Sequence, residues 1–194
     1  MLYAVLDAGL VAHVALVHDS QPYAVPVGYA RDGARLLLHG STGSRLFRGL
    51  AAGAPACVTV TLLDGLVLAR SLFESSMNYR SVMALGSCRP VAEPDKLAAL
   101  RCLSEHLLPG RWAQARQPSR QELAATQVLS MPLDECSVKV SDGGPGDPPE
   151  DLALPVWAGV VPLVSTWGVP VPADDLRHDL PASSYPTGWA ERRH

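Results

Sequence analysis

The feature that most constrains the fold is a series of short apolar runs in the first half of the chain, separated by very short turns. Segments at Ala12–His18, Tyr23–Ala30 and Arg35–His39 are divided only by Asp19–Pro22 and Arg31–Ala34. Short runs joined by such tight turns are typical of antiparallel hairpins. The sequence therefore predicts that the first half of the chain is mainly antiparallel β structure.

The same pattern continues further along the chain. Ala56–Leu63 alternates, Asp64-Gly65 predicts a hairpin turn, and Leu66–Phe73 is expected to return as the next strand. A longer strand is expected at Asn78–Ala92, with a bulge at Gly86. We therefore expect a mainly β fold of about six antiparallel strands with inserted helices. A closed or half-closed barrel is the economical arrangement, because it removes exposed edges.

Helices are predicted between the strands from apolar periodicity and end signals. Their expected ranges are Leu2–Ala8, Ser44–Ala52, Asp95–Leu108 and Ser119–Met131. The last of these begins with Ser119 and Glu122 in capping-box spacing. A late strand is expected at Glu135–Gly143.

The C-terminal part of the chain has a different composition. Gly143–Asp151 is a linker by its glycines and prolines, and Leu152–Val164 is apolar again. From Ser165 to His194 no period is visible, which predicts a disordered tail or one that lies over a partner surface. We therefore divide the chain into a β domain at 1–142 and an extension at 143–194 that packs on the barrel or on a partner.

Composition limits the classes of function. The formal net charge is −3, from 16 basic and 19 acidic residues, which argues against nucleic acid as the main partner. No segment has the roughly 18 uncharged apolar residues that a membrane span needs, and we see no signal peptide. The four cysteines show neither C-x-x-C nor metal-ligand spacing, so we expect a reduced cytoplasmic protein without a metal site.

The segment HGSTGSR, residues 39–45, is the first candidate for chemistry. Its glycines permit positive φ, its hydroxyl groups can donate, and successive N–H groups can form a nest for an anion. Arg45 adds a guanidinium that can bind two phosphate oxygens. The alternative is a plain connection from a strand to a helix capped by Ser44. No catalytic triad is visible, so in an enzyme a cofactor would carry the chemistry.

Together with HGSTGSR, two other segments point to a family. YAVPVGYA at 23–30 and MNYRSV at 77–82 flank it in the order seen in the flavin-nucleotide-binding branch of the pyridoxamine 5′-phosphate oxidase-like superfamily, close to Nim-type nitroimidazole-resistance proteins. The chain resembles this branch over roughly residues 7–140, and the resemblance continues through EDLALPVWAGVVPL. It implies an FMN-binding split β-barrel and a homodimer that holds FMN at its interface with residues of both subunits.

The resemblance also implies which residues surround the flavin. They are Pro26, Val27, Tyr29, His39, Gly40, Ser41, Thr42, Gly43, Ser44, Arg45, Asn78, Tyr79, Arg80, Ser81 and Trp157. The segment 39–45 would face the phosphate and ribityl chain, and the strand with Pro26 would line the isoalloxazine ring. Trp157 would approach the flavin of the partner subunit.

The chain departs from the oxidase at two points. Arg45 is followed by Leu46 instead of a second basic residue, so Arg48 or Arg80 would have to replace one phosphate ligand. The C-terminal arginine-histidine pattern that binds substrate in the oxidase is absent, which argues against activity on pyridoxamine phosphate.

Two classes of function follow from the resemblance. The first is an FMN-dependent oxidoreductase acting on small molecules such as nitro compounds or quinones. The second is a carrier or sensor that binds flavin or haem without turnover, because superfamily relatives hold haem or a deazaflavin in related barrels. His39 is then the residue of interest, since a haem protein needs an axial ligand.

Overall fold

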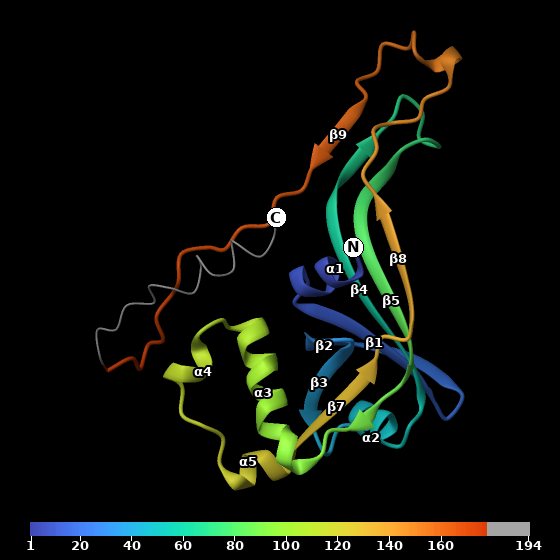
Figure 1. The fold of residues 1–194 in the computed structure, drawn as a ribbon. Helices are drawn as coiled ribbons and strands as arrows, with labels where there is room; N and C mark the ends of the chain where they lie inside the picture. The colour runs from blue at the N-terminus through green and yellow to red at the C-terminus, as the bar shows by residue number, and fades with distance from the viewer. Residues whose placement is uncertain (178–194) are drawn as a thin grey trace.

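The structure is a computed structural model that describes residues 1–177, and it is built around one antiparallel sheet (Figure 1). The strands lie in the order β6-β7-β3-β2-β1-β4-β5-β8, and β9 pairs with β4. Because the two ends of this order, β6 and β8, are not paired, the sheet is a split barrel. The strands are β1 Val11–His18, β2 Gln21–Asp32, β3 Arg35–Ser41, β4 Pro55–Leu68, β5 Ser76–Ser87, β6 Arg89–Pro90, β7 Thr126–Pro132, β8 Glu135–Ser141 and β9 Gly159–Pro162.

Short helices fill the connections. They are α1 Leu2–Ala8, α2 Arg45–Ala51, α3 Glu93–Leu107, α4 Arg111–Gln114 and α5 Arg120–Ala125, with a 3-10 turn at Pro149–Asp151. None of the helices in residues 1–177 combines the length and apolarity needed to span a lipid bilayer.

The barrel interior is filled by alternate residues of the strands. On β1, for example, Ala12, Val14 and Leu16 are buried while their neighbours are not, which is the period of two expected for a strand with one buried face. Tyr29 of β2 is fully buried, and its hydroxyl donates to the Leu6 carbonyl at 2.6 Å, which fixes α1 across the barrel. A second, smaller core lies under α3, on the other face of β2, β3 and β7.

The hairpin between β4 and β5 differs from the sequence prediction. Asp64-Gly65 is not a turn, because β4 continues through it to Leu68 with a bulge between Leu63 and Gly65. A Cβ on Gly65 would lie 2.8 Å from the Val161 carbonyl oxygen, so this glycine allows β9 to approach closely. The expected strand Leu66–Phe73 is therefore the end of β4 followed by a loop, and β4 and β5 form one long ribbon (Figure 1).

The predicted helix Ser119–Met131 is half helix and half strand. The capping box at its start is present, with Ser119 and Glu122 bonded reciprocally. The Arg116 guanidinium and the Ser119 amide hold the pKa of Glu122 down at about 2. After Ala125, however, the chain becomes β7, because it pairs with β3 along its whole length. The predicted bulge at Gly86 is also absent, since β4 and β5 keep their register there.

The segment after β8 is tied to the ribbon. The backbone N–H of Arg70 donates to the Asp147 carboxylate at 2.6 Å, and the Arg70 guanidinium pairs with it at 2.9 Å. Asn78 donates to the Gly143 carbonyl at 3.0 Å. Beyond β9, residues 163–177 run away from the barrel and are exposed (Figure 1). The rest of the predicted tail, 178–194, lies outside the described residues.

Candidate functional site

The loop between β3 and α2 is held by its own hydrogen bonds. Thr42 N donates to the Ala125 carbonyl at 3.0 Å, Gly43 N to Ser41 Oγ at 3.1 Å, and Ser44 N to the Ser41 carbonyl at 3.0 Å. These N–H groups are therefore not free to form the nest that the sequence predicted. Ser44 is the N-cap residue of α2, but its side chain makes no capping bond. An anion at this loop would have to be bound mainly by side chains.

The two glycines of the loop, which could adopt positive φ, do not have it. A Cβ on Gly40 would lie 2.3 Å from the ring of Phe47, so Gly40 makes room for this buried side chain of α2. A Cβ on Gly43 would meet nothing closer than Ser41 Oγ at 3.5 Å. Gly40 therefore serves the packing of the loop, and Gly43 leaves it open to solvent.

Arg45 is the charged group that the loop presents. Its guanidinium carbon lies 5.0 Å from the centroid of the Tyr23 ring, in cation–π geometry. The side chain is exposed, and within residues 1–177 it forms no ion pair with a carboxylate. The structure thus holds a cation in place without a counter-charge. Tyr23 was not selected from the sequence, because its strand position alone does not reveal the contact.

His39 lies just before the loop. Its register with β7 places it opposite Val128, on the side of the sheet that α3 covers. Nδ1 is buried without a hydrogen-bond partner among the described residues, and the same is true of the Tyr23 hydroxyl. Burial lowers the pKa of His39, so the ring is held in the neutral form that can bind a metal. Two unpartnered buried polar atoms therefore belong to residues next to the Arg45 loop.

The predicted residues of β2 point to opposite faces. Val27 and Tyr29 are buried in the barrel, and burial raises the pKa of the Tyr29 phenol. Tyr29 thus belongs to the core and is fully buried, and its assignment to the ring-binding set stays a prediction. Pro26 is exposed on the outer face, opposite His13 of β1.

The four residues of β5 are likewise divided by the alternation of the strand. Asn78 is buried and accepts a hydrogen bond from Ser141 as well as donating to the linker, so it anchors the chain after β8. Tyr79 and Ser81 lie on the outer face, where the Lys139 ammonium is 5.5 Å from the Tyr79 ring centroid. Arg80 points the other way, into a pocket.

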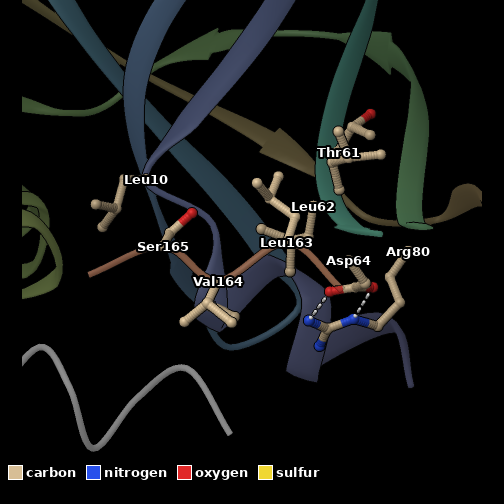
Figure 2. Close-up of a pocket in the computed structure, with 10 residues that line it drawn as sticks. Leu10, Thr61, Leu62, Asp64, Arg80, Leu163, Val164 and Ser165 are labelled. Atoms are coloured by element: carbon tan, nitrogen blue, oxygen red, sulfur yellow. Dashed lines mark hydrogen bonds and ion pairs between the residues drawn. The ribbon is translucent and has the colours of Figure 1, made fainter. Parts of the chain in front are cut away.

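The Arg80 pocket lies where α1, β4 and the segment after β9 meet (Figure 2). The Arg80 guanidinium binds both carboxylate oxygens of Asp64, at 2.8 and 2.7 Å, and this pairing raises the pKa of Arg80. Arg80 is therefore already neutralised by Asp64, which the sequence had assigned to a turn. The pocket has a volume of about 440 Å³ and is lined by Ala8, Leu10, Thr61, Leu62, Leu63, Asp64, Arg80, Leu163, Val164 and Ser165.

The predicted site residues lie beside different parts of β4. Near one end, α2 packs on Leu16, which pairs with Ala56 of β4. The pocket residue Leu62 is six residues further on, or about 20 Å along the strand. Trp157 is 63% exposed just before β9, whose first residue pairs with Leu68, a further about 20 Å away. A contact between Trp157 and a ligand at the Arg45 loop would have to come from a second copy.

The class of protein that the described residues define is an antiparallel split barrel with an exposed cation, Arg45, on the loop after its third strand. A sequence profile described as pyridoxamine 5′-phosphate oxidase matches residues 1–140. The chain belongs to this family. The comparison with curated proteins gave no match.

Solved structures show the same fold. The FAD and heme binding protein from Mycobacterium smegmatis is 45% identical, with a TM-score of 0.91 over 96% of this chain and 92% of that one. The flavocytochrome Anf3 from Azotobacter vinelandii is 39% identical, with a TM-score of 0.88 over 94% and 86%. A putative 5-nitroimidazole antibiotic resistance protein from Bacteroides thetaiotaomicron shares the fold at 19% identity, with a TM-score of 0.60 over 71% and 80%.

Proposed function

We propose that this protein is a redox protein that binds both a flavin and a haem, with the flavin phosphate at the Arg45 loop. The observation that carries the proposal is the exposed Arg45, placed over Tyr23 and without a carboxylate partner in the described chain. A fixed cation of this kind suits a phosphate dianion. Support comes from the relative at 45% identity, the FAD and heme binding protein from Mycobacterium smegmatis.

FAD is the flavin that we propose, in place of the FMN expected from the sequence. The FAD and heme binding protein matches nearly the whole chain. The flavin would supply electron transfer, while Arg45, Ser41 and Thr42 would hold its phosphate and the exposed Pro26 would contact its ring.

His39 is the haem ligand that we propose. Its Nδ1, buried and without a hydrogen-bond partner within residues 1–177, and its lowered pKa fit a ring that stays neutral and can bind iron. We also propose that the protein works as a homodimer with the flavin between two copies. Small nitro compounds and quinones are the electron acceptors to test first.

The experiment is to identify the cofactors and then to remove one ligand at a time. Acid release and chromatography distinguish FAD from FMN, and the pyridine haemochrome spectrum detects haem. Arg45→Ala should weaken flavin binding by about tenfold to 150-fold, because a charge-assisted contact of about 1.5–3 kcal/mol is lost. Arg101→Ala is the control, since Arg101 is an exposed arginine of α3 that is not among the residues assigned to the flavin, and it should leave the affinity unchanged. Equal affinities in the two variants would refute the loop assignment.

The haem ligand and catalysis need separate tests. His39→Ala should shift or abolish the Soret band, whereas His18→Ala, an exposed histidine beside Asp19, should not. An unchanged Soret band in His39→Ala would refute the ligand. Anaerobic bleaching of the flavin by NADH or NADPH, followed by reoxidation with a nitro compound or quinone, would support an enzyme over a carrier.

A further inference from the structure

The Arg80 pocket is lined by neither Arg45 nor His39. Figure 2 shows the Asp64–Arg80 ion pair at one end of its lining and Leu10 at the other. Its volume of about 440 Å³ lies in the range of small-molecule sites. The cavity therefore has an apolar part and one polar end. The apolar part is formed by Ala8, Leu10, Leu62, Leu63, Leu163 and Val164.

The apolar wall of the pocket is fixed in place but partly open to solvent. Leu63, Leu163 and Val164 are all exposed. The N–H of Leu163 donates to the Asp64 carbonyl at 2.9 Å, which ties the segment after β9 to the edge of the pocket. Exposed apolar side chains that surround a cavity are typical of ligand-binding grooves, because a bound molecule removes them from water.

The polar end of the pocket is built by the bulge in β4. The buried residues of β4 are even-numbered before the bulge and odd-numbered after it. Asp64 is the extra residue, since it lies between Leu63 and Gly65 and has no partner of its own on β5. Bulges redirect side chains and are frequent beside active sites. Here the bulge brings the Asp64 carboxylate against the Arg80 guanidinium.

The ion pair leaves one donor of Arg80 unused. Nε and Nη2 donate to the Asp64 oxygens at 2.8 and 2.7 Å, and within residues 1–177 Nη1 has no acceptor. The two charges cancel, so a charged ligand would lose its hydration without meeting an opposite net charge. An uncharged oxygen can instead accept from Nη1 in a charge-assisted hydrogen bond. A partly exposed pair of this kind stabilises a fold only a little, so its position at the pocket favours a role in binding.

We propose that the Arg80 pocket binds an uncharged, largely apolar molecule whose carbonyl oxygen accepts a hydrogen bond from Arg80 Nη1. The apolar wall covers the hydrocarbon part of the ligand, and Asp64 holds the guanidinium in position at the polar end. This inference goes beyond the flavin and the haem proposed above, because it requires neither Arg45 nor His39.

The first test compares three matched probes on the full chain as purified, with the cofactors that it holds. The probe 2-acetylnaphthalene carries a carbonyl, 2-ethylnaphthalene has a methylene group in its place, and 2-naphthoate is charged. In equilibrium dialysis we expect the ketone to bind at least about tenfold more tightly than either of the others. Tighter binding of 2-naphthoate would overturn the inference. A pocket already filled by a cofactor or by another part of the chain would not bind the ketone, which would also overturn it.

The second test asks whether the ketone lies in this pocket. Val164→Trp adds bulk to the wall at a side chain that is 76% exposed, and it should lower the ketone affinity at least about tenfold. Val17→Trp is the control, because Val17 is an exposed valine of β1 that does not line the pocket, and it should leave the affinity unchanged. Equal ketone affinities in the two variants would place the ligand elsewhere and overturn the inference.

The third test concerns the polar end. Asp64→Leu/Arg80→Met removes both charges together, so neither is left unpaired. The ketone should then lose its advantage over 2-ethylnaphthalene, while the hydrocarbon keeps its affinity. Asp32→Leu/Arg35→Met is the control, because it removes an ion pair of β2 and β3 that does not line the pocket. A ketone advantage that survives Asp64→Leu/Arg80→Met would overturn the role of Arg80.

These outcomes are separate from those of the proposed function. Arg45→Ala and His39→Ala report on the flavin and the haem, and neither residue lines the pocket. Ketone binding that is lost in Val164→Trp supports the pocket even if the flavin assignment at Arg45 fails. Absence of ketone binding overturns the pocket and leaves the flavin and haem assignments to their own tests.

Discussion

Replacing Gly40 by alanine tests whether the loop glycine serves packing or a ligand. The new Cβ would lie 2.3, 2.5 and 2.8 Å from three carbon atoms of the Phe47 ring, where ordinary contact begins near 3.4 Å. The ring must therefore move by about 1 Å. Phe47 is buried in the main core beside Leu46 and Leu50, so it cannot move without disturbing its neighbours.

The expected cost follows from this overlap. Overpacking a well-filled core destabilises a protein by about 1–3 kcal/mol. In a chain of this size, each kcal/mol lowers the melting temperature by about 2–4 °C. Gly40→Ala should therefore lower the melting temperature by roughly 2–12 °C. Phe47→Leu in the same chain should recover part of this loss, because the shorter side chain leaves room for the new methyl group.

Thermal unfolding followed by circular dichroism measures the effect, and flavin titration measures binding. Gly43→Ala is the matched control, since its Cβ would meet nothing closer than 3.5 Å, and we expect its melting temperature to change little. If Gly40→Ala melted with the wild type but lost the flavin, the glycine would be required by the ligand and the packing argument would be wrong.

Three further outcomes follow from the structure. Tyr29→Phe should cost about 1–3 kcal/mol in urea unfolding, because the Leu6 carbonyl loses its buried donor at 2.6 Å, and an unchanged midpoint would contradict this role. Burial lowers the pKa of His39 below its ordinary 6.5, so the unfolded chain binds the proton more readily than the folded chain. The free energy of unfolding should therefore fall as the pH drops below 6.5. His39→Gln should reduce this acid dependence in unfolding curves recorded across pH 5–7.5. Burial raises the pKa of the Cys88 thiol to about 11, so iodoacetamide at pH 8 should label it only after unfolding. Mass spectrometry measures the labelling, and rapid labelling of the native chain would contradict the burial of this thiol.

Local signals in the sequence were sufficient for much of the fold. The first three strands lie within a few residues of their predicted positions, because alternation and tight turns are properties of neighbouring residues. The capping box at Ser119 is present for the same reason. The assignment of Asp64-Gly65 to a turn was wrong, because Gly65 instead allows the close approach of β9, which is nearly a hundred residues away in the sequence. The helix predicted after Ala125 failed because pairing with β3 overrides local propensity.

The candidate site shows the same division between what local sequence signals predict and what contacts between distant residues decide. The segments around His39 and Arg80 carry the family resemblance, and the family is confirmed by the match over residues 1–140. The assignment of individual site residues to the flavin stays a prediction. Sequence order alone could not show that Tyr29 is enclosed in the core, or that Asp64 already neutralises Arg80.

By itself the sequence determined an antiparallel barrel, a short helix after the HGSTGSR loop and membership of a flavin-binding family. Only the tertiary structure decided which groups are available. The loop N–H groups are used by Ser41 and by Ala125 from a distant helix, and Gly40 is required by Phe47. Arg45 alone emerges from the loop as an unpaired charge in the described chain, held over Tyr23. These outcomes depend on hydrogen bonds and packing between residues far apart in the chain, which spacing along the sequence does not encode.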